Sequence, residues 1–179
     1  GQEETGGAAL GNLAVDNGKT RNAIGVAGGS PPLVRLLGAK NSTAAQKEQA
    51  AGALWELAVD NPRNSRLVAA AGGIPPLIGL ARDGTAWQKE QAPGALWCLA
   101  VDCEENRATI AEEGGIVPLI TLARDGSAAQ KEQAAGALSA LATDDEPNHA
   151  AIAAEGGLEP PTGPVRDGTH APQEQVRAW

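Results

Sequence analysis

The sequence predicts an all-α protein, built as a solenoid of repeated helical units. The segment 46–60 recurs as near-copies at 88–102 and 130–144. Leu54, Leu96 and Leu138 mark one position in the three copies, and the step between them is 42 residues. A fixed period of this length is typical of repeat arrays, in which each unit packs on its neighbours.

The repeated segment has the spacing of an amphipathic α-helix. Its small and apolar residues stand at i, i+3, i+4, i+7 and i+8, namely Ala50, Ala53, Leu54, Leu57 and Ala58. Positions with this spacing share one face of a helix. We therefore expect a long helix in each unit, with this face buried.

A capping box precedes each long helix. A hydroxyl residue stands three positions before a glutamine in all three copies, as Thr43 and Gln46, Thr85 and Gln88, and Ser127 and Gln130. In such a box the two side chains satisfy backbone N–H groups that the first helical turn leaves unpaired. The spacing predicts three helix starts.

The remaining sequence divides in order around these helices. Each complete unit has two short helical segments before the long one, with a Gly pair ending the first and Ser30 as the expected N-cap of a second. The predicted units are 1–16 (the closing helix of a truncated repeat), 17–60, 61–102, 103–144 and 145–179 (degenerate and truncated).

Two places depart from the pattern. Pro93 stands inside a long helix, where a proline removes one backbone hydrogen bond, so we expect a kink there. In the last unit Pro161, Thr162 and Pro164 replace the apolar residues of a short helix, and we expect loose docking from about Leu158 onward.

The composition excludes several classes of function. The formal net charge is −8, which argues against binding to nucleic acid or to anionic lipid. No run of apolar residues approaches the length of a membrane span. We expect Cys98 and Cys103 to be reduced thiols of an intracellular protein. The expected compartment is the cytoplasm, with the nucleus as the alternative. We expect a monomer, or an assembly that depends on a partner.

The chain resembles the armadillo repeat family. The segments that carry the resemblance are 73–81, 91–100 and 105–110, which recur in fixed order. The resemblance implies a right-handed superhelix of three-helix repeats that binds extended peptides or partner proteins along the concave groove of third helices. The sequence looks similar to vacuolar armadillo scaffolds and to the armadillo regions of plant U-box ubiquitin ligases.

Importin-alpha-like members of that family carry a Trp and, four residues later, an Asn on the third helix. The positions equivalent to the Trp hold Ala8, Gly52, Gly94 and Gly136, and those equivalent to the Asn hold Asn12, Glu56, Cys98 and Ala140. Only Asn12 fits, which disfavours a nuclear-import receptor.

The face opposite the apolar stripe is the predicted binding groove. Together with Asn12, its residues are Glu48, Gly52, Trp55, Glu56, Val59, Glu90, Gly94, Trp97, Cys98, Glu132 and Ser139. Trp55 and Trp97 lie on neighbouring units with glycine beneath them, and Trp is enriched at binding hot spots. The alternative interpretation is that these indoles pack sideways between adjacent long helices.

Two acidic patterns admit functional and structural interpretations. Glu48, Glu56, Glu90 and Glu132 could steer a basic peptide, or form an ordinary solvated face. Asp16, Asp60, Asp102 and Asp144 recur after each long helix, and helix N-capping explains them better than a metal site.

The sequence favours a noncatalytic scaffold or adaptor that has no cofactor or metal. The expected partner is a protein or an extended peptide, and a basic peptide is one form that it could take. Its only histidines, His149 and His170, have no nucleophile in a recognisable motif beside them. The alternatives are the substrate-recruiting region of a ubiquitin ligase, a nuclear-transport receptor, and a drifted gene product without a ligand.

Overall fold

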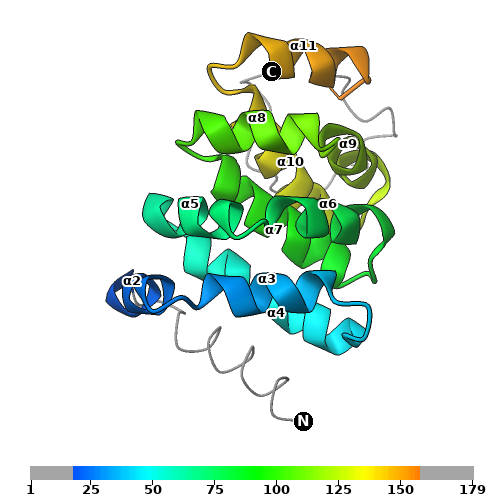
Figure 1. The fold of residues 1–179 in the computed structure, drawn as a ribbon. Coiled ribbons are helices and arrows are strands. Elements are labelled where there is room, and N and C mark those ends of the chain that lie inside the picture. Colours follow the sequence, from blue (N-terminus) through cyan, green and yellow to red (C-terminus); the bar gives the residue numbers. More distant parts are fainter. Residues whose placement is uncertain (1–17, 158–179) are drawn as a thin grey trace, which may run out of the picture.

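The structure is a computed structural model that describes residues 18–157. Within that range the chain forms ten helices and no strand, stacked in successive layers (Figure 1). The first helix of each layer is α2 (Gly18–Val26), α5 (Pro62–Ala70), α8 (Glu104–Glu112) and α11 (Glu146–Ala154). The second helices are α3 (Ser30–Gly38), α6 (Ile74–Asp83) and α9 (Ile116–Asp125), and the third are α4 (Ala44–Ala58), α7 (Gln88–Ala100) and α10 (Ala128–Ala142). The unit boundaries given above stay a prediction.

The three long helices begin as their capping boxes predict. Thr43 and Ser127 are the N-caps of α4 and α10, and both reciprocal hydrogen bonds of the box form at each. The same two bonds join Thr85 and Gln88, although α7 itself begins only at Gln88. α7 runs through Pro93 as one helix, so the kink expected there stays a prediction.

The core consists of small and branched aliphatic side chains from all three helices of each layer. Leu54, Leu57, Leu96, Leu99 and Leu141 are at most 1% exposed, and alanines of the third helices fill the space between them. Because these side chains are small, α4, α7 and α10 pack side by side.

Glycine pairs let each first helix turn into the second. The first glycine is left-handed, with φ of 80° at Gly28 and 79° at Gly72. The second packs so closely that a Cβ at Gly73 would lie 2.7 Å from Cγ1 of Val68. The predicted role of these pairs in ending the first helices is confirmed.

Buried asparagines join each long helix to the first helix that follows it. The Nδ2 atoms of Asn64, Asn106 and Asn148 donate to the carbonyl oxygens of Leu57, Leu99 and Leu141, at 2.8, 2.8 and 3.1 Å. The last carbonyls of a helix have no partner within it, so these bonds satisfy buried acceptors. This role was not predicted from the sequence.

The predicted N-cap of α3 was wrong. α3 begins at Ser30 itself, with Gly29 as its N-cap, and the Ser30 hydroxyl is buried without capping the helix. The prediction of loose docking beyond Leu158 concerns residues outside the described range.

The aspartates after the long helices are not N-caps either. Asp60, Asp102 and Asp144 have φ of 48°, 52° and 52°, in the left-handed region, and the N-caps are the residues after them, Asn61, Cys103 and Asp145. Each aspartate reverses the chain direction after a long helix, a conformation that Asp tolerates better than most residues. Asp16 lies outside the described residues.

Candidate functional site: the third-helix surface

The outward faces of α4, α7 and α10 form a continuous surface along the array, which we call the third-helix surface. Its residues within the described range are Glu48, Gly52, Trp55, Glu56, Val59, Glu90, Gly94, Trp97, Cys98, Glu132 and Ser139. Asn12, the remaining predicted groove residue, lies outside that range. These residues lie on α4, α7 and α10, except Val59, which directly follows α4. The three helices are adjacent (Figure 1).

Glutamines of the capping boxes hold the three helices in register. Gln88 Nε2 donates to the carbonyl oxygen of Ala44 at 2.9 Å, and Gln130 Nε2 donates to that of Ala86 at 2.7 Å. In each case the Oε1 atom of the same side chain accepts the capping N–H of its own helix. One amide therefore caps a helix and ties it to the backbone at the start of the previous helix, or just before that start in the case of Ala86.

A second polar contact joins neighbouring units at this end of the surface. The hydroxyl of Thr85 donates to Oε1 of Glu48 at 2.7 Å. Glu48 is thus engaged in the array, whereas Glu132 on α10 is exposed. Glu48, Glu90 and Glu132 each follow a lysine near the start of a long helix; the lysines are Lys47, Lys89 and Lys131. The end of the third-helix surface where these helices start therefore carries mixed charge.

Each tryptophan of the surface rests on a glycine of the next helix. A Cβ at Gly94 would lie 2.7 Å from Cε2 of Trp55, and one at Gly136 would lie 2.6 Å from Cδ2 of Trp97. Both indoles are partly buried and pack against the core. Of the two interpretations of these residues, lateral packing between long helices is what the structure shows.

The tryptophans still contribute to the surface, because each keeps a solvent-accessible part. Ser139 stands at the third equivalent position and is exposed, so the series of indoles ends at α10. Gly94 is buried beneath Trp55 and not free to contact a partner. The apolar floor thus covers the junctions from α4 to α7 and from α7 to α10.

Cys98 lies within this floor and is held as a neutral thiol. Burial raises its pKa to about 11, although a hydrogen bond from the Trp55 side chain opposes that rise. The negative charges of Asp60 and Glu56 add to it. A thiol with so high a pKa is a poor nucleophile at neutral pH. Cys98 and Cys103 are both free cysteines in the structure.

The other end of the surface is acidic. Asp60, Asp102 and Asp144 are exposed at the ends of α4, α7 and α10, and Glu56 lies one turn before Asp60. The surface therefore has an apolar floor bordered by mixed charge on one side and by carboxylates on the other.

The described range lacks other kinds of site. No group of three or more His, Cys, Asp or Glu residues between positions 18 and 157 could hold a metal ion. Among the helices of that range, none is long and apolar enough to cross a membrane. His149 is exposed on α11.

Comparison with known proteins identifies the repeated unit. Residues 103–143 match the sequence model of the armadillo/beta-catenin-like repeat. This segment is an armadillo repeat. The described part of the chain has the all-α armadillo solenoid fold that the sequence predicted. A search of curated proteins finds no match.

Solved structures with the armadillo fold include engineered proteins. Computationally designed armadillo repeat proteins for modular peptide recognition superpose with a TM-score of 0.82 at 23% identity, over 96% of this chain and 69% of theirs. A designed armadillo repeat protein in complex with the peptide (KR)4 gives 0.77 at 23% identity, over 84% and 62%. A further engineered protein gives 0.80 at 26% identity, over 87% and 62%, so the chain spans less than two thirds of its length.

Sequence reasoning missed the lateral bonds of the capping glutamines. Their signal was present, because Gln88 and Gln130 belong to capping boxes repeated at one period. A polar side chain that recurs at a predicted helix–helix junction is a candidate for bonding across it, but the register of the helices decides whether it does.

Proposed function

We propose that this armadillo array is a noncatalytic interaction module that binds an extended segment of a partner protein along the third-helix surface. The observation that carries the proposal is the pair of partly buried indoles, Trp55 and Trp97, which keep a solvent-accessible part on two adjacent long helices. Each indole is fixed on a glycine, so little conformational entropy remains to be lost on binding.

The chemistry of the surface suits a segment that combines apolar and basic side chains. Apolar side chains fit the floor of indoles, where aromatic groups supply contact area at low entropic cost. Basic side chains fit the border formed by Glu56, Asp60, Asp102 and Asp144, because a row of carboxylates attracts cations most strongly at low salt.

Two designed armadillo proteins of the same fold support the proposal. One is described as designed for modular peptide recognition, and the other is in complex with the alternating basic peptide (KR)4. Neither shares more than 23% of its residues with this chain, so the likeness supports the use of the fold and not the choice of contacts.

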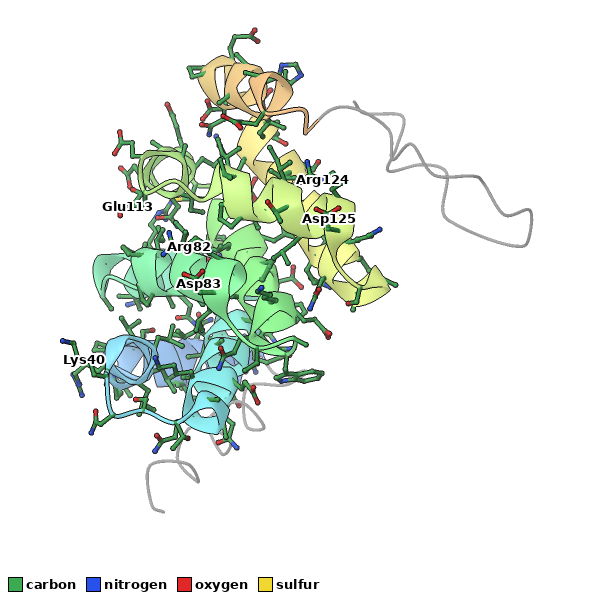
Figure 2. The ribbon with its side chains drawn as sticks, turned by 90° about the vertical axis from the view of Figure 1, so that its right-hand side faces the viewer. Lys40, Arg82, Asp83, Glu113, Arg124 and Asp125 are labelled. Carbon is green, nitrogen blue, oxygen red and sulfur yellow. The ribbon has the colours of Figure 1, made fainter. Side chains whose placement is uncertain are left out.

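A peptide-display selection on the whole chain tests the proposal. Because truncation of Trp55 or Trp97 would also remove core packing, the test variant adds bulk at the surface instead, as Glu56→Arg with Ser139→Arg. The matched control, Thr121→Arg with Asp125→Arg, makes the same change of charge on exposed positions of α9. Figure 2 shows Asp125 at the end of that helix beside Arg124.

We expect extended peptides with basic and apolar residues to be enriched on the native chain and on the control, and to be lost on the test variant. Equal binding by all three proteins, or no enrichment on the native chain, would overturn the proposal. Helicity is checked by circular dichroism for each variant.

A further inference from the structure

The first helices form a second charged face, separate from the third-helix surface. We call it the first-helix face; its charged, exposed residues are Lys19, Arg63, Arg66, Glu104, Glu105, Glu112, Glu113, Glu146 and Glu155. They belong to α2, α5, α8 and α11 or directly follow these helices, in successive layers of the array (Figure 1). Glu113 lies at the end of α8 (Figure 2).

Charge changes sign halfway along this face. α2 and α5 present Lys19, Arg63 and Arg66, whereas α8 and α11 present only glutamates at exposed charged positions. Equivalent positions differ directly: Arg63 in one unit corresponds to Glu105 in the next. The order along the array is therefore basic, basic, acidic, acidic.

The charges that dominate the middle of the face have no partners within the described chain. Neither Arg63 nor Arg66 forms an ion pair with a residue between positions 18 and 157, and the same holds for Glu105 and Glu112. By contrast, Arg82 and Arg124 of the second helices pair with Asp83 and Asp125, at 2.8 and 3.1 Å (Figure 2).

We propose that the first-helix face is a docking surface for a second copy of this chain, in antiparallel orientation. A face with the order basic, basic, acidic, acidic is complementary to itself when it is turned by 180° about an axis between α5 and α8. In that arrangement α5 of each copy faces α8 of the other, and α2 faces α11. The interface is isologous, as two-fold dimers require.

The balance of charge sets the strength of this association. Exposed ion pairs contribute about 0–1 kcal/mol each, so several pairs are needed. The net charge of −8 makes two copies repel over longer distances, but at 0.1 M salt that repulsion is screened beyond about 10 Å while contacting pairs still attract. The dimer is weak and dissociates at about 1 M salt, where the screening length is about 3 Å.

Sedimentation equilibrium of the whole chain, up to about 1 mM, detects such an association. One variant reverses the basic part (Arg63→Glu with Arg66→Glu), a second reverses the acidic part (Glu105→Arg with Glu112→Arg), and a third combines all four changes. The monomer mass is 18.1 kDa. Circular dichroism checks that each variant keeps its helices.

At 0.1 M salt we expect the average mass of the native chain to rise with concentration toward that of a dimer. The two variants in which only the basic part or only the acidic part is reversed should remain monomeric. The four-site variant, and an equimolar mixture of the two reversals, should associate again, because opposite charges then face each other once more. The variant with the reversed acidic part is decisive. It lowers the net negative charge, so an effect of net charge alone would strengthen its association, whereas the self-complementary face predicts a loss.

Three outcomes would overturn the proposal. The native chain could remain monomeric at about 1 mM; the single reversals could associate as the native chain does; or the folded four-site variant could fail to associate. The last two outcomes would mean that another surface holds the copies together.

Discussion

The indole of Trp55 occupies the space that a side chain at Gly94 would need. A Cβ built on Gly94 would approach Cδ2, Cε2 and Cζ2 of that ring to within 2.7–2.8 Å. Trp97 and Gly136 repeat the arrangement one layer further along the array. A tryptophan on one long helix and a glycine on the next therefore form one packing unit, which sets the floor of the third-helix surface.

Gly94→Ala should destabilise the array, although alanine favours helix more than glycine does. Overpacking against the ring costs about 1–3 kcal/mol, which exceeds the gain in helix propensity of about 1 kcal/mol. The free energy of unfolding in urea measures the net effect. Gly79→Ala is the control: it lies inside α6 with no atom within 4 Å of an added Cβ, and should stabilise by about 0.5–1 kcal/mol. Equal effects at both positions would contradict the account.

Cys103→Asn should stabilise the start of α8. Cys103 is an N-cap with φ of −141° that makes no side-chain cap bond, while Asn61 at φ of −142° caps α5 by accepting from the N–H of Asn64. A good N-cap contributes about 1 kcal/mol. The reverse change, Asn61→Cys, should destabilise by a similar amount or more, because Asn61 also donates to Asn22. Loss of stability in Cys103→Asn would argue against this prediction.

Gln88→Glu isolates the bond that Gln88 makes between third helices. A carboxylate still accepts the capping N–H of Thr85, but it cannot donate to the carbonyl of Ala44 and leaves two acceptors facing each other in a buried site. We expect a loss of about 1–3 kcal/mol. Gln46→Glu makes the same change in an exposed capping box, where a glutamate is favoured near the helix N-terminus, and should be neutral or stabilising. A comparable loss in both variants would mean that the lateral bond contributes little.

The Cys98 thiol should react slowly with thiol reagents at pH 8, because burial raises its pKa to about 11. The raised pKa also makes stability depend on pH. The folded chain keeps this thiol neutral while the unfolded chain ionises it above its ordinary pKa, so the contribution is complete below about pH 8.5, and declines as pH rises toward 11. The Cys103→Asn background leaves Cys98 as the only thiol. Labelling at pH 8 that is as fast in the folded chain as in urea would contradict this environment.

Local sequence signals predicted most of the fold. The capping boxes at Thr43, Thr85 and Ser127 and the left-handed glycines act within one turn of chain, so the residues themselves determine them. The prediction that Asp60 is an N-cap was wrong because local signals did not decide between two neighbouring residues. Asp60 and Asn61 are both good N-cap residues and stand side by side. Which of them caps depends on the chain direction needed to return from α4 to α5, and that is a property of packing.

The candidate site was predictable in outline only. The helical period placed Trp55 and Trp97 on one face, but two interpretations remained, because side-chain rotamers and the spacing of α4 and α7 decide where an indole lies. Gly94 was predicted to line the groove, and it is buried beneath the ring. The lateral bonds of Gln88 and Gln130 depend on the same spacing.

The indole N–H resonances of Trp55 and Trp97 give the most direct test of the central claim, that an extended segment binds along the third-helix surface. Trp87, 54% exposed just before α7, serves as an internal reference. In a titration of the ¹⁵N-labelled chain with a selected peptide, we expect the Trp55 and Trp97 signals to shift together and to saturate, while that of Trp87 changes little. Saturable binding that leaves Trp55 and Trp97 unshifted would contradict the claim and place the binding site elsewhere.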